Sequence, residues 1–311
     1  MSAGLLCEKE KGVFTISATP FTDSGELDLQ SMDSLIEFYL EKGVDGITIL
    51  GILGEAQKLT TEELSTCLKH VLNRVNNRAK VIVGVSNTSL ETLSQLAKLS
   101  MDRGASGVMV APNISHDSDQ KMYDYFEQVF EAIGFQTPVC FQDHPYMTKV
   151  EIHVDCFNRL VEDFSQLVML KHEAWPGLSK LTQIRKCSEK DGLRRVSILC
   201  GNGGLYLPQE LSRGADGAMT GFAYPEMLVE VVKKFHEGEK DYAEDLFDTY
   251  LPLMRYEQQP GFGLLIRKEI LKRRGAIKSA AIRAPGGELN RIDHEELTRL
   301  TDRLDQKLQE K

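Results

Sequence analysis

Long apolar runs are missing from this sequence, and so is an excess of basic residues. No stretch approaches the roughly 18 consecutive apolar residues of a membrane-spanning helix, so we expect no membrane association. The first residues, MSAGLLCEKEKG, lack the basic region and the apolar core of a signal peptide. The formal net charge is −9. Because contacts to phosphates need a basic surface, we expect no nucleic-acid partner.

Paired cysteines and metal-binding histidine motifs are also missing. The six cysteines form no C-x-x-C pair, and the seven histidines form no H-x-x-x-H pattern. Scattered residues of this kind are more typical of isolated buried or surface side chains than of a zinc site or a redox pair. We therefore expect no metal site, and a cytoplasmic location, because free thiols suit a reducing compartment.

The sequence does have eight short apolar runs that alternate with longer amphipathic segments. Short β-rich runs separated by amphipathic helices indicate βα units with a parallel sheet. Eight units in succession predict an α/β fold, the closed (βα)8 TIM barrel, over residues 12–236. The expected strands are 13–18, 46–50, 80–85, 107–111, 138–142, 167–171, 196–200 and 216–220. The expected helices include 28–42, 61–76, 90–103, 119–133, 151–163, 177–189 and 224–236.

An internal repeat supports the βα units. The sequence GVDGITIL at 43–50 recurs as GASGVMVA at 104–111 and as GADGAMTG at 214–221. The first glycine of each copy suits a helix end, and the second glycine starts a strand. Open doubly wound sheets use the same turns, so the repeat alone does not prove closure. Residues 237–311 predict a C-terminal helical extension that covers the barrel or forms subunit contacts. No linker separates it, so we expect one domain, 1–311.

The sixth expected strand ends in an unusual way, in LVMLKHEAWPG at 167–177. Side chains alternate along a strand, so Lys171 and Glu173 should face one side and His172 the other. In such barrels the active site lies at the C-terminal ends of the strands. A buried lysine that loses its charge can attack a carbonyl, and a nearby carboxylate can move protons at the adjacent carbon. The pattern alone fits a structural ion pair equally well.

Other residues at the same expected rim are candidates for substrate contacts. Four polar side chains lie at or just after the ends of the fifth, seventh and eighth strands: Gln142, His144, Asn202 and Thr220. They suit contacts to substrate hydroxyl groups, but they also fit structural roles. Gly201 and the glycines after it suit either a carboxylate-binding backbone or a tight turn. Glu55 is expected to begin a helix or a turn. Trp175, the one tryptophan, is expected to be a packed lid or core residue.

Together these segments resemble the superfamily of dihydrodipicolinate synthase and N-acetylneuraminate lyase. The resemblance implies a (βα)8 enzyme that acts on a small 2-keto acid through a Schiff base on Lys171. It also implies that backbone groups of Ile52 and Leu53 hold the substrate carboxylate, that no cofactor is needed, and that the protein is a homo-oligomer, a tetramer. The matching segments are TPFTDSGELD (19–28), GILGEAQKLTTEE (51–63), LKHEA (170–174), GNGGLYLP (201–208) and GADGAMTG (214–221).

Several positions depart from the pattern of the synthase and the lyase. Ile52 and Leu53 stand where hydroxyl-bearing residues are usual, and Gln142 stands where a tyrosine normally shuttles protons. Two further replacements are Asn113-Ile114, for a tyrosine pair of the synthase, and Met147, for its arginine. An amide cannot donate and take back a proton as a phenol can. The sequence therefore argues against the synthase reaction.

The pattern FQDHP followed by LKHE resembles the dehydratase branch of the superfamily, particularly 2-keto-3-deoxy-L-arabonate dehydratase. The resemblance implies that Glu173 is the base and that the product is 2-oxoglutarate semialdehyde. Two alternatives stay open. A retro-aldolase or synthase-like enzyme that uses pyruvate would share the enamine intermediate, whereas a non-catalytic, ligand-sensing barrel would use no chemistry at all.

Overall fold

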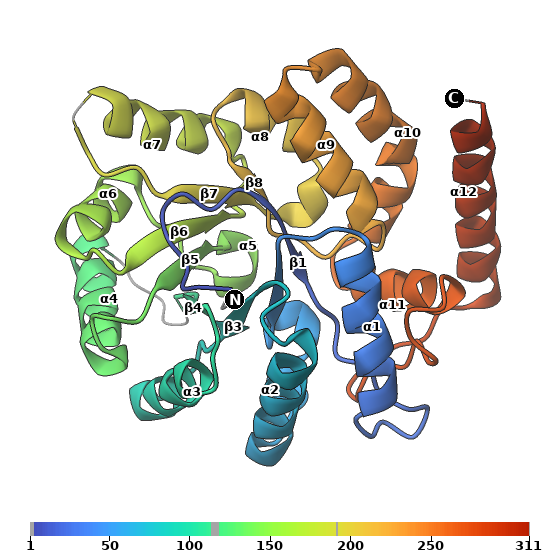
Figure 1. The fold of residues 1–311 in the computed structure, drawn as a ribbon, viewed down its shortest axis with the longest axis horizontal. Helices are drawn as coiled ribbons and strands as arrows, with labels where there is room; N and C mark the ends of the chain where they lie inside the picture. The colour runs from blue at the N-terminus through green and yellow to red at the C-terminus, as the bar shows by residue number, and fades with distance from the viewer. Residues whose placement is uncertain (1–2, 113–117, 191, 311) are drawn as a thin grey trace.

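Eight parallel strands close into a barrel in the order in which they occur along the chain (Figure 1). The computed structural model describes residues 3–112, 118–190 and 192–310, so Asn113 and Ile114 lie outside the described residues. The closed barrel confirms the (βα)8 prediction. The strands are β1 (Gly12–Ile16), β2 (Gly46–Ile49), β3 (Lys80–Gly84), β4 (Gly107–Val110), β5 (Val139–Asp143), β6 (Leu167–His172), β7 (Ser197–Cys200) and β8 (Gly217–Ala218).

Helices cover the outside of the barrel, and short helices shape several loops at its rim. Each long helix buries one apolar face against the strands, which accounts for the amphipathic pattern of the sequence. The helices around the barrel are α1 (Leu29–Glu41), α2 (Thr61–Val75), α3 (Leu90–Asp102), α4 (Asp119–Ile133), α6 (Val154–Asp163), α7 (Leu178–Lys190), α8 (Leu207–Ser212) and α9 (Pro225–Glu237). The rim carries α5 (Pro145–Thr148), η1 (Ile52–Gly54), η2 (Ala56–Lys58) and η3 (Asn202–Gly204).

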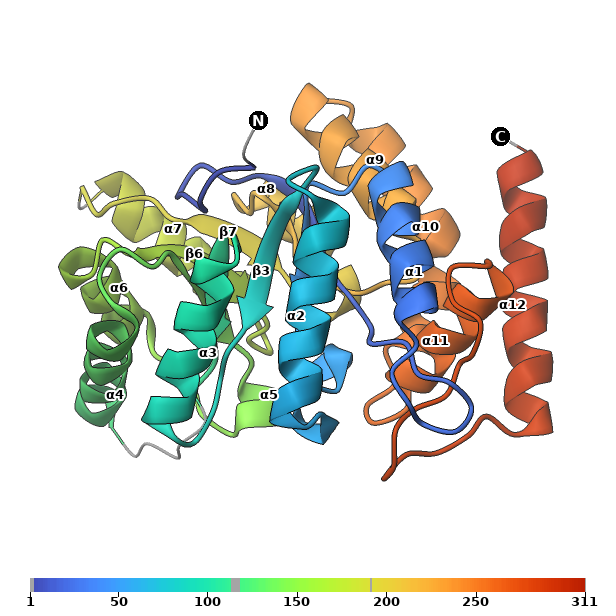
Figure 2. The same ribbon diagram turned by 60° about the horizontal axis from the view of Figure 1, so that its bottom comes forward.

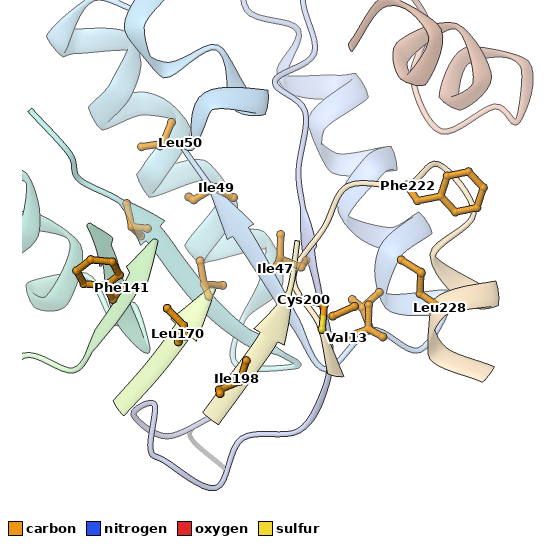
Figure 3. Packing of buried hydrophobic residues seen from close by; sticks show 14 of the residues in the cluster. Val13, Ile47, Ile49, Leu50, Phe141, Leu170, Ile198, Cys200, Phe222 and Leu228 are labelled. Atoms are coloured by element: carbon orange, nitrogen blue, oxygen red, sulfur yellow. The ribbon is translucent and has the colours of Figure 1, made fainter. Parts of the chain in front are cut away.

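The core has an outer layer between strands and helices, and an inner layer inside the barrel. Figure 3 shows part of the outer layer, including Ile49, Phe141 and Leu170. The inner layer holds Met169 together with other apolar side chains: Phe14, Ile16, Ile82, Met109, Cys140, Val168, Leu199 and Met219. Burying one such large side chain stabilises the fold by about 1.5–3 kcal/mol. The barrel interior is therefore packed, and space for chemistry remains only above this inner layer.

The strand β6 carries one extra residue relative to β5, since Val139 pairs with Leu167 and Cys140 with Met169. From Met169 onward the side chains alternate regularly. Met169 belongs to the inner layer and Leu170 to the outer layer. Because the period of a strand is two, the next inward position is Lys171.

The C-terminal extension consists of α10 (Lys240–Glu257), α11 (Gly263–Arg273) and α12 (Arg291–Gln309). The helix α10 packs on α9, and α11 and α12 pack on α10. Figures 1 and 2 both place α11 beside α1, and there the backbone N–H of Lys278 donates to Ser31 Oγ at 3.0 Å. None of the helices in the described part of the chain is long and apolar enough to cross a membrane.

Candidate active site

Lys171 and Glu173 lie next to each other at the C-terminal end of β6. Lys171 Nζ is 3.0 Å from Glu173 Oε2, and the two residues are only 4% and 7% exposed. Both side chains therefore face the same side, as the alternation of the strand predicts. Two opposite charges so far from bulk solvent are stable only because each compensates the other.

Two further strands contribute neighbours to the carboxylate of Glu173. Gln142, on β5, donates from Nε2 to Glu173 Oε2 at 2.8 Å. Asn202, after β7, donates from Nδ2 to the backbone oxygen of Glu173 at 3.2 Å, and its backbone nitrogen is 3.5 Å from Oε1. Gly201 leaves room for this carboxylate, because a Cβ at Gly201 would overlap Cγ and lie 2.6 Å from Oε1 of Glu173.

The pKa of Glu173 lies below the ordinary value for a glutamate. Burial alone raises this pKa, but the charge of Lys171, the nearby His144 and the hydrogen bond from Gln142 together lower it further than burial raises it. The side chain is therefore held as a carboxylate that is ready to accept a proton. A buried carboxylate in contact with a primary amine is the arrangement that proton transfer between the two groups requires.

The two histidines near this pair have different surroundings. His144 follows β5; burial lowers its pKa, and its Nδ1 is buried with no hydrogen-bond partner among the described residues. His172 points away from Lys171, as predicted, and its Nε2 lies 3.0 Å from the backbone oxygen of Gly177. His144 therefore stays a candidate contact, whereas His172 belongs to the layer outside the barrel.

The loop after β2 lies at the same rim. Leu53, within η1, packs its half-buried side chain against the inner apolar layer. Glu55 follows η1 in the left-handed region, with φ of 53°, and immediately precedes η2. Its place between these two helical turns agrees with the prediction that it begins a helix or turn.

The sequence missed what the side chain of Glu55 does. Glu55 is 1% exposed, and its carboxylate contacts Lys268 Nζ at 2.6 Å and Lys58 Nζ at 3.0 Å. It also accepts from the backbone N–H of Arg283 at 3.1 Å. Lys268 and Arg283 lie in the C-terminal extension, so Glu55 joins that extension to the loop that carries Ile52 and Leu53. No local pattern indicates the two partners from the extension, whereas Lys58 lies only three residues along the chain.

The loop after β7 turns sharply. Asn202, Gly203 and Gly204 all have positive φ, of 49°, 69° and 78°. A Cβ at Gly204 would lie 3.9 Å from Cγ2 of Thr220, which is 4% exposed after β8. The glycines therefore serve a tight turn, and the turn brings Asn202 to Glu173 and Gly204 to Thr220.

Trp175 is not a core residue. Its side chain is 56% exposed and lies against Tyr206, with ring centroids 5.2 Å apart. Of the two expected positions, packed lid or core, only the core position is wrong, because Trp175 follows the end of β6, where Pro176 and Gly177 carry the chain across the surface. The two aromatic rings form an exposed pair, Trp175–Tyr206, near the rim.

The candidate residues thus fall into two groups. Lys171, Glu173, Gln142, Gly201 and Asn202 form one contiguous cluster, and His144 acts on it electrostatically. Ile52 and Leu53 on one loop, and Thr220 on another, border the same rim. Within residues 3–112, 118–190 and 192–310, no three His, Cys, Asp or Glu side chains are grouped so that they could hold a metal ion.

Comparison with known proteins places the chain among barrel enzymes. The model of the dihydrodipicolinate synthetase family matches residues 9–306. The L-2-keto-3-deoxyarabonate dehydratase of Azospirillum brasilense is 27% identical over 307 residues, which cover 96% of this chain and 95% of that protein. The 4-hydroxy-tetrahydrodipicolinate synthase of Oceanobacillus iheyensis is 30% identical over 78% of this chain and 80% of its own.

Solved structures give the same result. The crystal structure of dihydrodipicolinate synthase from Rhodopseudomonas palustris matches with a TM-score of 0.94 and 46% identity, covering 96% of this chain and 99% of that one. The 4-hydroxy-tetrahydrodipicolinate synthase of Methylacidiphilum fumariolicum SolV matches with a TM-score of 0.86 and 26% identity, over 97% of this chain and 98% of that one.

Proposed function

The chain belongs to the dihydrodipicolinate synthetase family and is a lyase, and we propose that it dehydrates a 2-keto-3-deoxy sugar acid through a Schiff base on Lys171. The observation that carries this proposal is the buried pair of Lys171 Nζ and Glu173 Oε2, 3.0 Å apart above the packed barrel interior. The substrate we favour is 2-keto-3-deoxy-L-arabonate, and the product is 2-oxoglutarate semialdehyde.

The first step makes the amine reactive. A proton passes from Lys171 Nζ to Glu173, which leaves an uncharged amine inside the barrel. The amine attacks C2 of the keto acid, and loss of the C2 oxygen as water gives an iminium. The iminium withdraws electrons from C3, so the reaction needs neither a metal nor an organic cofactor.

The second step removes water from the substrate. Glu173, again a carboxylate, takes a proton from C3, and the electron pair of that C–H bond forms the enamine. The enamine expels the C4 hydroxyl, which leaves as water with the proton that Glu173 carries. Loss of a C5 proton and protonation at C3 give an enol between C4 and C5, and transfer of the hydroxyl proton of this enol to C4 gives the aldehyde. Water then hydrolyses the iminium, so the net change is the loss of one water molecule.

Gln142 supports Glu173 in this scheme and does not replace the missing phenol. Its amide donates to Glu173 Oε2, which fixes the carboxylate but cannot relay a proton. We assign the C1 carboxylate of the substrate to the backbone groups of Ile52 and Leu53. We assign the contacts to the hydroxyl groups of the substrate to Gly201, Asn202, Thr220 and His144.

The dehydratase proposal is supported by the relative from A. brasilense, which matches along nearly the whole chain. The synthase reaction is the second candidate, because the R. palustris structure that is named a dihydrodipicolinate synthase is 46% identical. Gln142 favours the dehydratase, since the synthase resemblance requires a tyrosine there. Retro-aldol cleavage is a third outcome that shares the enamine.

Two incubations separate these reactions. The purified protein is given 2-keto-3-deoxypentonate, and the products are separated by chromatography. The proposal predicts 2-oxoglutarate semialdehyde without pyruvate. Stoichiometric pyruvate with glycolaldehyde would establish the aldolase instead. A second incubation, with pyruvate and aspartate semialdehyde, should give no condensation product, and rapid condensation there would establish the synthase.

A further inference from the structure

A glutamine from the C-terminal extension reaches the loop that contacts Glu173. Gln258 directly follows α10, and its side chain lies against Gly203 in the turn after β7. A Cβ at Gly203 would overlap Cγ, Cδ and Nε2 of Gln258. Gly203 neighbours Asn202, which hydrogen-bonds Glu173. The amide of Gln258 therefore sits one residue along the loop from a direct partner of the proposed base.

The residue before Gln258 fixes its position. Glu257 is fully buried and contacts Arg267 Nη2 at 2.6 Å and Nε at 2.7 Å. Its other oxygen accepts from the backbone N–H of Ala223 at 3.1 Å, in the loop after β8. The end of α10 is thus anchored to the rim by charge-assisted hydrogen bonds, which are about twice as strong as neutral ones. Gln258 is presented from a rigid support.

The side-chain amide of Gln258 is free to bind a ligand as far as the described residues are concerned. Gln258 is half-buried, and no hydrogen bond joins its side chain to any residue of the described chain. An amide both donates and accepts, so it matches a hydroxyl group, which does the same. The charges of the nearby cations are already compensated, Arg267 by Glu257 and Lys268 by Glu55, although Nη1 of Arg267 has no hydrogen-bond partner among the described residues.

We propose that Gln258 is a specificity-determining residue that hydrogen-bonds the terminal hydroxyl group of the substrate. The C-terminal extension thereby selects acids with a neutral, hydroxylated end over shorter acids. This inference rests on the proposed function and deepens it, since it assigns the far end of the substrate to a residue outside the barrel.

The test compares two substrates in two variants. The substrates are 2-keto-3-deoxypentonate and 4-hydroxy-2-oxobutanoate, which stops at C4 and lacks the terminal hydroxymethyl group. Gln258→Met keeps the size of the side chain on Gly203 but removes both hydrogen-bonding groups. We expect kcat/KM for the five-carbon acid to fall about tenfold, and for the four-carbon acid to change less than about twofold. The matched control is Gln259→Met, at an exposed neighbour, which should change neither value.

The outcomes separate this inference from the proposed function. An equal loss on both acids in Gln258→Met, or no loss on either, would overturn the role of Gln258 while leaving the reaction intact. An unmutated protein that consumes neither acid would overturn the proposed function itself. Borohydride trapping of pyruvate on Gln258→Met should match the unmutated protein, because the amine is untouched; a lost adduct would show that the substitution disturbs the barrel and would also contradict the inference.

Discussion

At the scale of single residues, the account depends on how a barrel holds a lysine away from water. Lys171 lies above a packed apolar layer and meets one carboxylate, that of Glu173, which is itself fixed by Gln142 and Asn202. Such a pair contributes little net stability compared with apolar residues of the same size. We propose that the pair serves the reaction, since a proton can pass between Lys171 and Glu173 without the help of solvent.

Replacing Glu173 tests whether it acts as the base while Lys171 forms the Schiff base. Glu173→Gln keeps the size of the side chain but removes the base. We expect kcat for dehydration to fall by about 10²–10⁴, while borohydride still traps a keto acid on Lys171 at equilibrium. Steady-state kinetics and mass spectrometry check the two halves of this prediction. The exposed Glu162→Gln is the control, and full turnover in Glu173→Gln would rule out Glu173 as the base.

A second buried acid, Glu210, predicts a pH effect on stability. Glu210 is 8% exposed on α8, and burial raises its pKa to about 7 from the usual 4.5. The native chain therefore binds this proton more tightly than the unfolded chain, so the stability it contributes is present below pH 4.5 and is lost as pH rises towards 7. We expect Glu210→Gln to raise the free energy of unfolding at pH 8, by at most about 3 kcal/mol, and to matter least near pH 4.5. Urea titrations of both proteins at both pH values measure these free energies. If Glu210→Gln changed the free energy of unfolding by the same amount at pH 8 and at pH 4.5, the prediction would be contradicted.

At the scale of elements, the C-terminal extension does more than cover the barrel. Residues of α11 and of the segment after it hold the loop after β2 through Glu55, and the end of α10 holds the loops after β7 and β8. The rim loops that surround Lys171 are therefore supported from one side by residues far along the chain. Loops on such a rigid support keep a substrate in place.

The ion pair of Lys268 and Glu55 allows a test of whether the C-terminal extension supports the rim loops. Lys268→Met leaves the carboxylate of Glu55 buried with Lys58 as its remaining cation, so we expect a loss of about 3 kcal/mol in the free energy of unfolding. We also expect a higher KM for the keto acid, because the loop with Ile52 and Leu53 loses its anchor. The exposed Lys272→Met, on the same helix, should change neither quantity. A Lys268→Met protein with native stability and KM would contradict this role of the extension.

The elements also show which features a sequence can predict. The strands and the inward direction of Lys171 and Glu173 follow from a period of two, which is local. The last strand was expected at 216–220 and is assigned only over Gly217–Ala218, but backbone hydrogen bonds of Asp216, Met219 and Thr220 with the neighbouring strands continue along the expected range. The ion pair of Glu55 with Lys268 and the contact of Gln258 with Gly203 were not predictable, since Lys268 lies 213 residues from Glu55 and no local pattern records such a distance. The core was one of the two positions expected for Trp175, because a tryptophan usually packs inside, but the side chain is exposed.

At the scale of the whole molecule, one exposed aromatic pair offers a test of whether copies of the chain associate. The Trp175–Tyr206 pair is exposed, and large aromatic side chains exposed together mark association sites. The resemblance described above implies a tetramer. We expect light scattering to give the mass of four chains, and Trp175→Ser to give a smaller species. Tyr242→Ser, at another exposed aromatic residue, is the control, and an unmutated protein that runs as a monomer would contradict the expectation.

The most direct measurement for the whole account is covalent trapping of a keto acid. The protein is incubated with pyruvate and sodium borohydride, digested, and examined by mass spectrometry. The account predicts one reduced pyruvate adduct, on the peptide that contains Lys171, and none in Lys171→Arg. An unmodified Lys171, or an adduct on a different lysine, would contradict the Schiff base on which the proposed chemistry depends.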